Sequence, residues 1–259
     1  MAPDRLSILH VSPQPKEVAR YYARRDFDVA QTLAGSFRDA CVELGIRELE
    51  MPTIYSEDGV PTYDEVQDGY QGVVVSGSVH SVYDAPEWDY RLEVLVREIV
   101  ERQKTALLGI CYGQQLVAQA CGGSVEQGLD GPEIGVVPVK LTGHGQRDPL
   151  FQGLSDQFHV HQVHSDTVMM PPRSDGIWVR ELARSRLYDK QAFAVGDKVR
   201  TVQFHPEISP EALKILLKLE PSPHVAPRPA LANVWRAGRT GQTILRNFLK
   251  HFVHGNGSC

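Results

Sequence analysis

Cys111 stands between two glycines, Gly109 and Gly113, where the sequence changes from a strand pattern to a helix pattern. The apolar run at residues 105–110 predicts a buried strand. Residues 116–121 carry apolar side chains at helical spacing and are followed by two glycines. This is the G-x-nucleophile-x-G pattern of a strained strand-to-helix turn, here with cysteine as the nucleophile. The first amides of the helix and its positive dipole end would face the sulfur and favour the reactive thiolate.

His205 and Glu207 could supply the base and the orienting acid that a cysteine nucleophile needs. His205 follows an apolar strand pattern, so its ring can stand at the edge of the sheet beside the turn. Glu207 can turn back to hold the far imidazole nitrogen, and Pro206 restricts the backbone between the two residues. A carboxylate in that position fixes the tautomer and stabilises the imidazolium. We therefore predict Cys111, His205 and Glu207 as catalytic residues.

Each of these residues also has a non-catalytic interpretation. Cys111 could be a buried, inert thiol, and His205 with Glu207 could be a surface pair. Each interpretation would be preferred if the residue stood in another context. The glycines around Cys111 and the place of His205 after a strand together favour catalysis.

The elements that must position these residues indicate an α/β protein. We expect strands at residues 6–11, 46–51, 72–77 and 105–110, and helices at residues 26–44 and 87–103. A polar stretch that includes Gly59, Pro61 and Asp64 is expected to be a loop. Strands that alternate with helices and consist of continuous apolar runs predict a three-layer, mostly parallel sheet flanked by helices.

The second half of the chain has a different pattern. Short strands are expected at residues 134–141, 158–163, 176–182, 191–195 and 199–204, which suggests a small antiparallel addition to the main sheet. Helices are expected at residues 210–219 and 240–252, and the four prolines within residues 221–229 predict a surface loop or extended strap. We expect one domain over residues 1–259, with a catalytic region at about residues 6–252 and a disordered tail at residues 253–259.

Composition excludes several classes of protein. The net charge of −5 gives no support to binding of nucleic acid or anionic membranes, and no apolar run approaches the length of a membrane helix. The four cysteines lack paired spacing, which favours free thiols in a reducing cytoplasm.

His159, His161 and His164 form an H-x-H-x-x-H pattern that could bind a metal. In a strand the first two share one face while the third points to the other, and no acidic or thiol ligand has helpful spacing. We therefore expect neither a metal nor a cofactor.

The whole pattern resembles the class I, triad-type glutamine amidotransferases. Their G-x-C-x-G-x-Q pattern occurs at residues 109–115, and their later H-P-E pattern occurs at residues 205–207. Further similar segments are Val75-Ser76-Gly77-Ser78, Ser81-Val82-Tyr83-Asp84, Gly122-Gly123-Ser124-Val125, Glu133-Ile134-Gly135 and His164-Ser165-Asp166-Thr167-Val168. The resemblance covers about residues 6 to 252 and implies a flavodoxin-like fold.

The resemblance also implies roles for individual residues. Cys111 would attack the side-chain amide carbon of glutamine or a γ-glutamyl group, His205 would act as base and then as acid, and Glu207 would orient His205. Water would then resolve a γ-glutamyl thioester. The oxyanion hole would consist of the Tyr112 amide and the backbone of Gly77 and Ser78. The implied substrate contacts are Gln115 and the backbone around Gln162, Val163 and His164.

The turn Ser76-Gly77-Ser78 departs from the two glycines, or Gly-Gly-Pro, that the family often carries. The backbone amides survive this change, and we expect the Ser78 hydroxyl to face the ligand. A serine turn of this type resembles the γ-glutamyl peptidase branch and related stand-alone members.

Three functions remain open at this point. The first is a stand-alone hydrolase of glutamine or a γ-glutamyl conjugate, and the second is a glutaminase subunit that delivers ammonia to a separate synthase. The third is a non-enzymatic binding module on the same fold, which the complete set of three catalytic side chains disfavours. The sequence has no glycine-rich phosphate-binding motif, so we expect no fused ATP-dependent synthetase.

Overall fold

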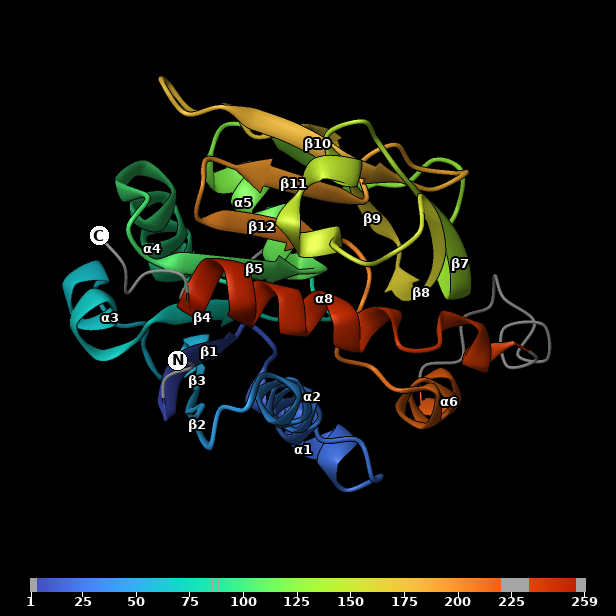
Figure 1. Cartoon of the computed structure of the whole chain (residues 1–259), viewed down its shortest axis with the longest axis horizontal. Helices are drawn as coiled ribbons and strands as arrows, with labels where there is room; N and C mark the ends of the chain where they lie inside the picture. The colour runs from blue at the N-terminus through green and yellow to red at the C-terminus, as the bar shows by residue number, and fades with distance from the viewer. Residues whose placement is uncertain (1–3, 85, 88, 220–232, 255–259) are drawn as a thin grey trace.

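The computed structural model describes residues 4–84, 86–87, 89–219 and 233–254. Its main feature is a ten-stranded sheet with helices on both faces (Figure 1). Nine of the strands run in the spatial order β2 (Glu48–Glu50), β1 (Arg5–Ser12), β4 (Gly72–Val75), β5 (Ala106–Ile110), β12 (Val199–Val202), β11 (Ala192–Val195), β10 (Val179–Arg184), β7 (Glu133–Leu141) and β8 (Gln157–His164). The tenth, β3 (Thr53–Tyr55), also pairs with β1. This arrangement confirms the expected α/β fold class.

The sheet has a parallel part and an antiparallel part. Strands β2, β3, β1, β4, β5 and β12 pair in parallel, whereas β12, β11, β10, β7 and β8 pair antiparallel. The expected antiparallel addition thus continues the main sheet rather than forming a separate one. Strands β4 and β5 are buried along their whole length because helices cover both faces.

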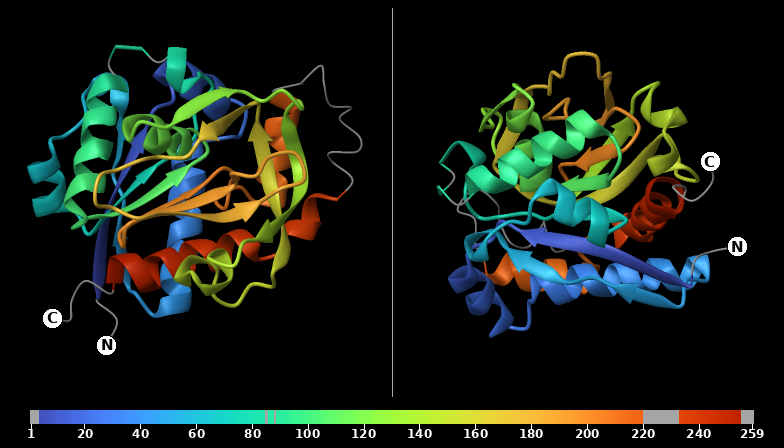
Figure 2. Two further views of the ribbon diagram at one scale, coloured as in Figure 1. Left: turned by 90° about the horizontal axis from the view of Figure 1, so that it is seen from above. Right: turned by 90° about the vertical axis from the view of Figure 1, so that its left-hand side faces the viewer.

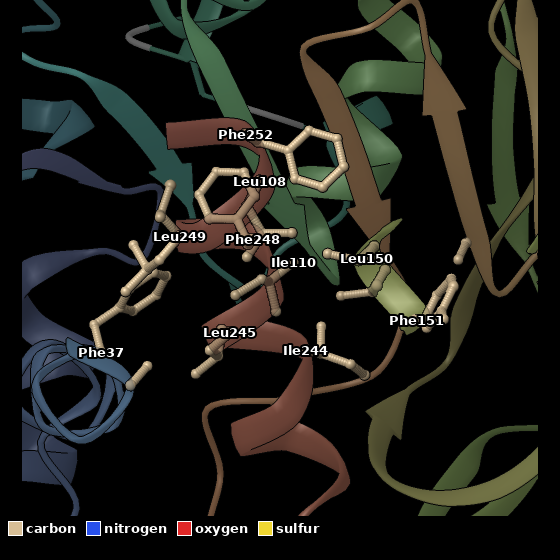
Figure 3. Close-up of a cluster of buried hydrophobic side chains, with 14 of the residues drawn as sticks. Phe37, Leu108, Ile110, Leu150, Phe151, Ile244, Leu245, Phe248, Leu249 and Phe252 are labelled. Atoms are coloured by element: carbon tan, nitrogen blue, oxygen red, sulfur yellow. The ribbon is translucent and has the colours of Figure 1, made fainter. Parts of the chain in front are cut away.

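Three layers follow from the packing of the helices. On one face, α2 (Val29–Leu44) and α8 (Thr240–Phe248) cover the sheet, and Phe37 of α2 packs edge-to-face with Phe248 of α8 (Figure 3). On the other face lie α3 (Tyr63–Gly69), α4 (Asp89–Arg102) and α5 (Tyr112–Ala120). Figure 2 shows the sheet between these two groups of helices.

A third, smaller apolar cluster lies away from these two cores. It joins α1 (Lys16–Ala23) to α6 (Pro210–Leu219) through Tyr22, Leu216 and Leu217, each less than one-tenth exposed. The helix α6 begins as expected: Ser209 caps it by accepting a hydrogen bond from the Ala212 amide, and proline is its first residue.

Several elements differ from the sequence-based expectation. Residues 63–69 form α3 instead of part of a loop, because Thr62 and Glu65 make a reciprocal capping box. Helix α1 and the two-stranded sheet of β6 (Ser124–Gln127) and β9 (Asp166–Met170) were not expected. Helix α2 begins at Val29 rather than residue 26, since Asp28 caps it through the Gln31 amide.

The last helix continues beyond α8 as a wider turn, Leu249–Val253, so Val253 belongs to the packed chain rather than to a tail. The rest of the expected tail, apart from His254, and the proline-rich segment at residues 221–229 lie outside the described residues. Among the helices that are described, none combines the length and apolar character needed to cross a bilayer.

Candidate active site

The carboxyl ends of three neighbouring parallel strands deliver the candidate site. Strands β4, β5 and β12 lie side by side, with Val75 opposite Gly109 and Val202 opposite Ile110. The chain therefore leaves β4 toward Gly77, leaves β5 into the Cys111 turn and leaves β12 toward His205. Ligands of open α/β sheets bind at this edge.

Cys111 occupies the strand-to-helix turn that its flanking glycines predict. It precedes the first residue of α5 and has a backbone φ of +52°, which is strained for a residue with a side chain. A Cβ on Gly113 would lie 2.3 Å from the Val75 carbonyl oxygen, and one on Gly109 would lie 2.7 Å from the Gly113 carbonyl. Both glycines thus permit the close approach that holds the turn in place.

His205 and Glu207 form a hydrogen-bonded pair beside this turn. The imidazole Nδ1 lies 2.7 Å from Glu207 Oε1, and the two side chains are 10% and 4% exposed. Because an ionised carboxylate can only accept, Nδ1 carries a proton and Nε2 is the nitrogen left for chemistry. The His205 amide donates to the carbonyl of His161 at 2.9 Å, which ties the segment to β8.

The sulfur and the imidazole meet at Gly77. A Cβ built on Gly77 would lie 3.1 Å from His205 Cε1 and 3.9 Å from Cys111 Sγ. The three residues therefore surround one small volume, and a side chain at position 77 would obstruct it.

The pKa of His205 reflects this setting. Burial opposes the charged imidazolium, but the charges of Glu207 and Cys111, together with hydrogen bonds to both, raise the pKa of His205 well above its ordinary value of 6.5. An imidazolium between a carboxylate and a thiolate is the arrangement that activates a cysteine nucleophile.

A second polar group approaches the sulfur from the sheet. Gln203 is fully buried, and its Nε2 lies 3.5 Å from Cys111 Sγ. Gln115 in turn donates to the Gln203 side-chain oxygen at 3.3 Å and to the Asp166 carbonyl at 3.1 Å. The expected substrate residue Gln115 is thereby held at the cavity wall.

A cavity of about 710 Å³ opens from the thiol. Its polar end contains the catalytic candidates together with Gly77, Ser78, His80, Ser81, Gln115, Val163, His164 and Asp166. Its other end is lined by apolar side chains of the third cluster, namely Tyr22, Phe27, Val29, Ile134, Ile208, Leu216, Leu217 and Leu219. The cavity has the size of a site for a whole small molecule, for which about 300–1,000 Å³ is typical.

Tyr112, Gly77 and Ser78, the expected oxyanion residues, all adjoin the thiol. Tyr112 is the first residue of α5, so its amide is one of the free donors of the helix N-terminus. The Ser78 hydroxyl has two protein partners: it lies 3.1 Å from the Pro13 carbonyl oxygen and 2.8 Å from His80 Nδ1. Pro13 follows β1 and His80 belongs to the loop that carries Ser78; because Ser78 also lines the cavity, a contact between its hydroxyl and the ligand stays a prediction.

The expected substrate residues of β8 divide into two groups. Val163 and His164 line the cavity. The Gln162 side chain is fully buried elsewhere, where it donates to Gln191 at 2.5 Å and lies 3.4 Å from Glu133. Only its backbone is left for a role at the cavity.

His161 and His164 both take part in hydrogen bonds. His161 bonds to the carbonyl oxygens of Ile208 and Val234 at 2.6 and 2.9 Å. His164 lies 2.9 Å from the Asp166 carbonyl and 3.2 Å from Glu133. Across the described residues, no group of three or more metal-ligating side chains was found.

Sequence reasoning missed some polar residues at the site. Asp166 lines the cavity and accepts hydrogen bonds from the Ser81 and Tyr83 hydroxyls. Gln203 lies two residues before His205, and a buried glutamine in an apolar strand pattern was the available signal. Asp166 lies two residues after His164, within a segment that resembles the family, and this position was the available signal for it.

Comparison with known proteins identifies the family of the chain. The family model for glutamine amidotransferase class-I matches residues 27–217. The chain therefore belongs to the class-I glutamine amidotransferase family, as the sequence resemblance predicted.

Individual relatives add detail. The chain is 27% identical over 201 residues to γ-glutamyl peptidase 2 of Arabidopsis thaliana, covering 77% of this chain and 79% of that protein. It is 36% identical over 186 residues to a glutamine-hydrolysing GMP synthase of Porphyromonas gingivalis, covering 70% of this chain but only 34% of the synthase. A glutamine amidotransferase from Thermotoga maritima shares the fold, with a TM-score of 0.73 at 22% identity over 96% of this chain and 98% of the other.

Proposed function

We propose that the protein is a stand-alone hydrolase of γ-glutamyl amides that works through Cys111, His205 and Glu207. The observation that carries this proposal is the meeting of thiol, imidazole and hydrogen-bonded carboxylate at the polar end of one cavity. Membership of the family and similarity to a γ-glutamyl peptidase support the same chemistry.

In the first half of the reaction, Cys111 Sγ attacks the γ-carbonyl carbon and the oxygen takes negative charge. Backbone amides of Tyr112 and of Gly77 or Ser78 stabilise this oxyanion. The C–N bond then breaks as His205 gives its proton to the departing amine, which leaves a γ-glutamyl thioester. Glu207 keeps the imidazole oriented and stabilises its charged form.

In the second half, water attacks the thioester carbon and gives a proton to His205. The C–S bond breaks, glutamate leaves, and the thiolate forms again next to the imidazolium. His205 thus gives up a proton in the first half of the reaction and regains one in the second.

The rest of the cavity fits the γ-glutamyl group. Its α-carboxylate would meet the backbone of Val163 and His164, and Gln115 would contact the bound group. Asp166 and Glu207 are the carboxylates among the described residues that line the cavity. Glu207 holds His205, and each Asp166 oxygen, although it accepts from Ser81 or Tyr83, can accept a further hydrogen bond, so Asp166 would accept the α-ammonium.

The apolar end of the cavity favours a conjugate over free glutamine. Ammonia, the leaving group of glutamine, would use none of the surface formed by Tyr22, Phe27 and Leu216. A γ-glutamyl peptide with an apolar residue would bury that residue there, at about 25 cal/mol for each Å² removed from water.

The alternative is a glutaminase subunit that delivers ammonia to a separate synthase. The similarity to the amidotransferase part of a GMP synthase favours this candidate. A non-enzymatic binding module is the lesser alternative.

Incubation of the purified protein alone separates these functions. Glutamine, γ-glutamylglycine and γ-glutamylphenylalanine would be tested in parallel, with products measured by mass spectrometry and Cys111→Ala as the matched control. Steady turnover, fastest for the phenylalanine conjugate, is expected. Hydrolysis of glutamine that is barely detectable until a synthase is added would support the subunit, and binding without turnover would support the module.

A further inference from the structure

The two sides of the candidate oxyanion hole come from separate elements. Gly77 and Ser78 follow β4, whereas Tyr112 begins α5 after β5. A pair of amides stabilises an oxyanion only when both are held at the right separation before the reaction begins. Some contact must therefore fix the loop after β4 relative to the start of α5.

Asp89 lies where such a contact is needed. It is the first residue of α4 and is 2% exposed. Its Oδ2 accepts a hydrogen bond from the Tyr112 hydroxyl and lies 2.9 Å from His80 Nε2. Burial, followed by the nearby Asp89 charge, raises the pKa of Tyr112, which keeps the phenol protonated as the donor.

His80 extends the connection to the other side of the hole. Its Nδ1 lies 2.8 Å from the Ser78 hydroxyl, and its ring packs edge-on against Tyr112 with centroids 4.9 Å apart. One carboxylate oxygen thus joins the two candidate oxyanion residues, Tyr112 directly and Ser78 through His80.

The neighbouring amide of the loop already has a partner. The Val79 amide donates to the Gln14 side-chain oxygen at 2.9 Å. Within residues 77–79, this leaves the amides of Gly77 and Ser78 to bind an oxyanion. A contact to the Ser78 side chain can therefore fix the loop without occupying these two amides.

We propose that Asp89 and His80 are positioning residues that hold the two amide donors of the oxyanion hole at the separation that acyl transfer needs. The proposal rests on the proposed function, because it assumes a tetrahedral intermediate formed on Cys111. Neither residue exchanges a proton with the substrate; each acts through Tyr112 or Ser78.

The test compares two reactions of the same thiol. Hydrolysis of γ-glutamyl-p-nitroanilide passes through an oxyanion, whereas alkylation of Cys111 by iodoacetamide is a direct displacement that forms none. Asp89→Ala and His80→Ala should lower kcat for hydrolysis by about tenfold or more, less than the ~10²–10³-fold that follows complete loss of a donor. KM and the alkylation rate should each change by less than about threefold.

Two further variants address a merely structural role. Asp89→Asn keeps an oxygen that can accept from both neighbours, so it should recover most of the kcat lost in Asp89→Ala. Asp148 is a matched control, since it is a largely buried acid that pairs with Arg200 at 2.9 Å. It is not among the residues that line the cavity. Asp148→Ala should lower the melting temperature while leaving the ratio of hydrolysis to alkylation unchanged. His80→Ala keeps the test decisive if Asp89→Ala does not fold, because His80 is only partly buried.

The outcomes separate this proposal from the proposed function. The acylation burst with p-nitrophenyl acetate, corrected with Cys111→Ala, also forms an oxyanion but needs no γ-glutamyl group. If wild-type protein hydrolyses no γ-glutamyl substrate, the proposed function fails and the burst alone decides the role of Asp89 and His80. An unchanged burst and kcat in Asp89→Ala and His80→Ala, or an equal fall in acylation and alkylation, would overturn the positioning role.

Discussion

The two ends of helix α5 carry thiols with different surroundings. Cys111 precedes the helix and Cys121 follows it, and their exposed fractions are nearly the same, 6% and 8%. At the C-terminal end, burial raises the pKa of Cys121 to about 11, and the charge of Arg97 offsets this only in part. At the N-terminal end, the thiol has the helix amides, His205 and Gln203 around it.

This difference teaches that burial does not decide whether a cysteine is inert. The helix dipole favours an anion at the start of α5 and disfavours one at its end. Only the first end lies at the carboxyl edge of the sheet, where the chain leaving β12 brings an imidazole to the sulfur. The direction of one helix therefore separates the candidate nucleophile from a thiol that only packs.

Removal of each thiol gives the largest predicted contrast. Cys111→Ala should reduce γ-glutamyl hydrolysis by about 10⁴-fold or more, because the nucleophile itself is lost. Cys121→Ala should retain activity and lose at most about 1–2 kcal/mol of unfolding free energy. Steady-state kinetics and thermal denaturation of both variants measure this, and activity retained in Cys111→Ala would refute the catalytic assignment.

The partners of Cys111 give the next effect. His205→Ala should be nearly as severe as loss of the thiol, since both proton transfers use this ring. Glu207→Ala should be about two orders of magnitude milder, because an orienting carboxylate contributes less than the groups that react. Single-turnover kinetics would measure both, and equal losses in the two variants would show that Glu207 does more than orient His205.

Alkylation compares the thiols in one molecule. At neutral pH a glutamine-like chloroketone should modify Cys111 at least about 10²-fold faster than Cys121, because burial raises the pKa of Cys121 to about 11 and leaves little of it as thiolate. Cys41 should also be spared, since burial raises the pKa of Cys41 to about 11. Peptide mass spectrometry after native labelling, with a denatured sample as the control, gives the rates. Labelling of all these thiols at the same rate would mean that the helix N-terminus confers no special reactivity.

The sequence predicted the turn at the start of α5 and the strands beside it because their signals are local. Gly109 and Gly113 flank Cys111, and apolar runs mark β5 and β12 without any knowledge of contacts. The order of the strands then brings His205 beside the turn. These parts of the fold and site follow from short patterns of glycine, proline and apolar residues.

Other features depend on contacts between distant segments and were missed. Asp89 touches Tyr112 across 23 positions in the chain, and no pattern in α4 marks it as part of a site. The side chain of Gln162 faces a buried polar cluster because of its partners Glu133 and Gln191, 29 positions away on either side. One missed feature is local: Thr62 and Glu65 form the capping box of α3, but the polar composition around them outweighed that signal.

The smallest predicted effect is a shift in pH dependence that tests why the two ends of α5 differ. Because the pKa of His205 lies well above 6.5, the imidazolium survives to higher pH than an ordinary histidine, and the general acid for the leaving amine survives with it. The alkaline limb of kcat/KM should therefore lie well above pH 6.5. In Glu207→Gln it should move down by about one pH unit or more, since the carboxylate that favours the charged ring is gone. A limb that stays in place in this variant would mean that Cys111, rather than Glu207, supplies the charge that holds the proton on His205.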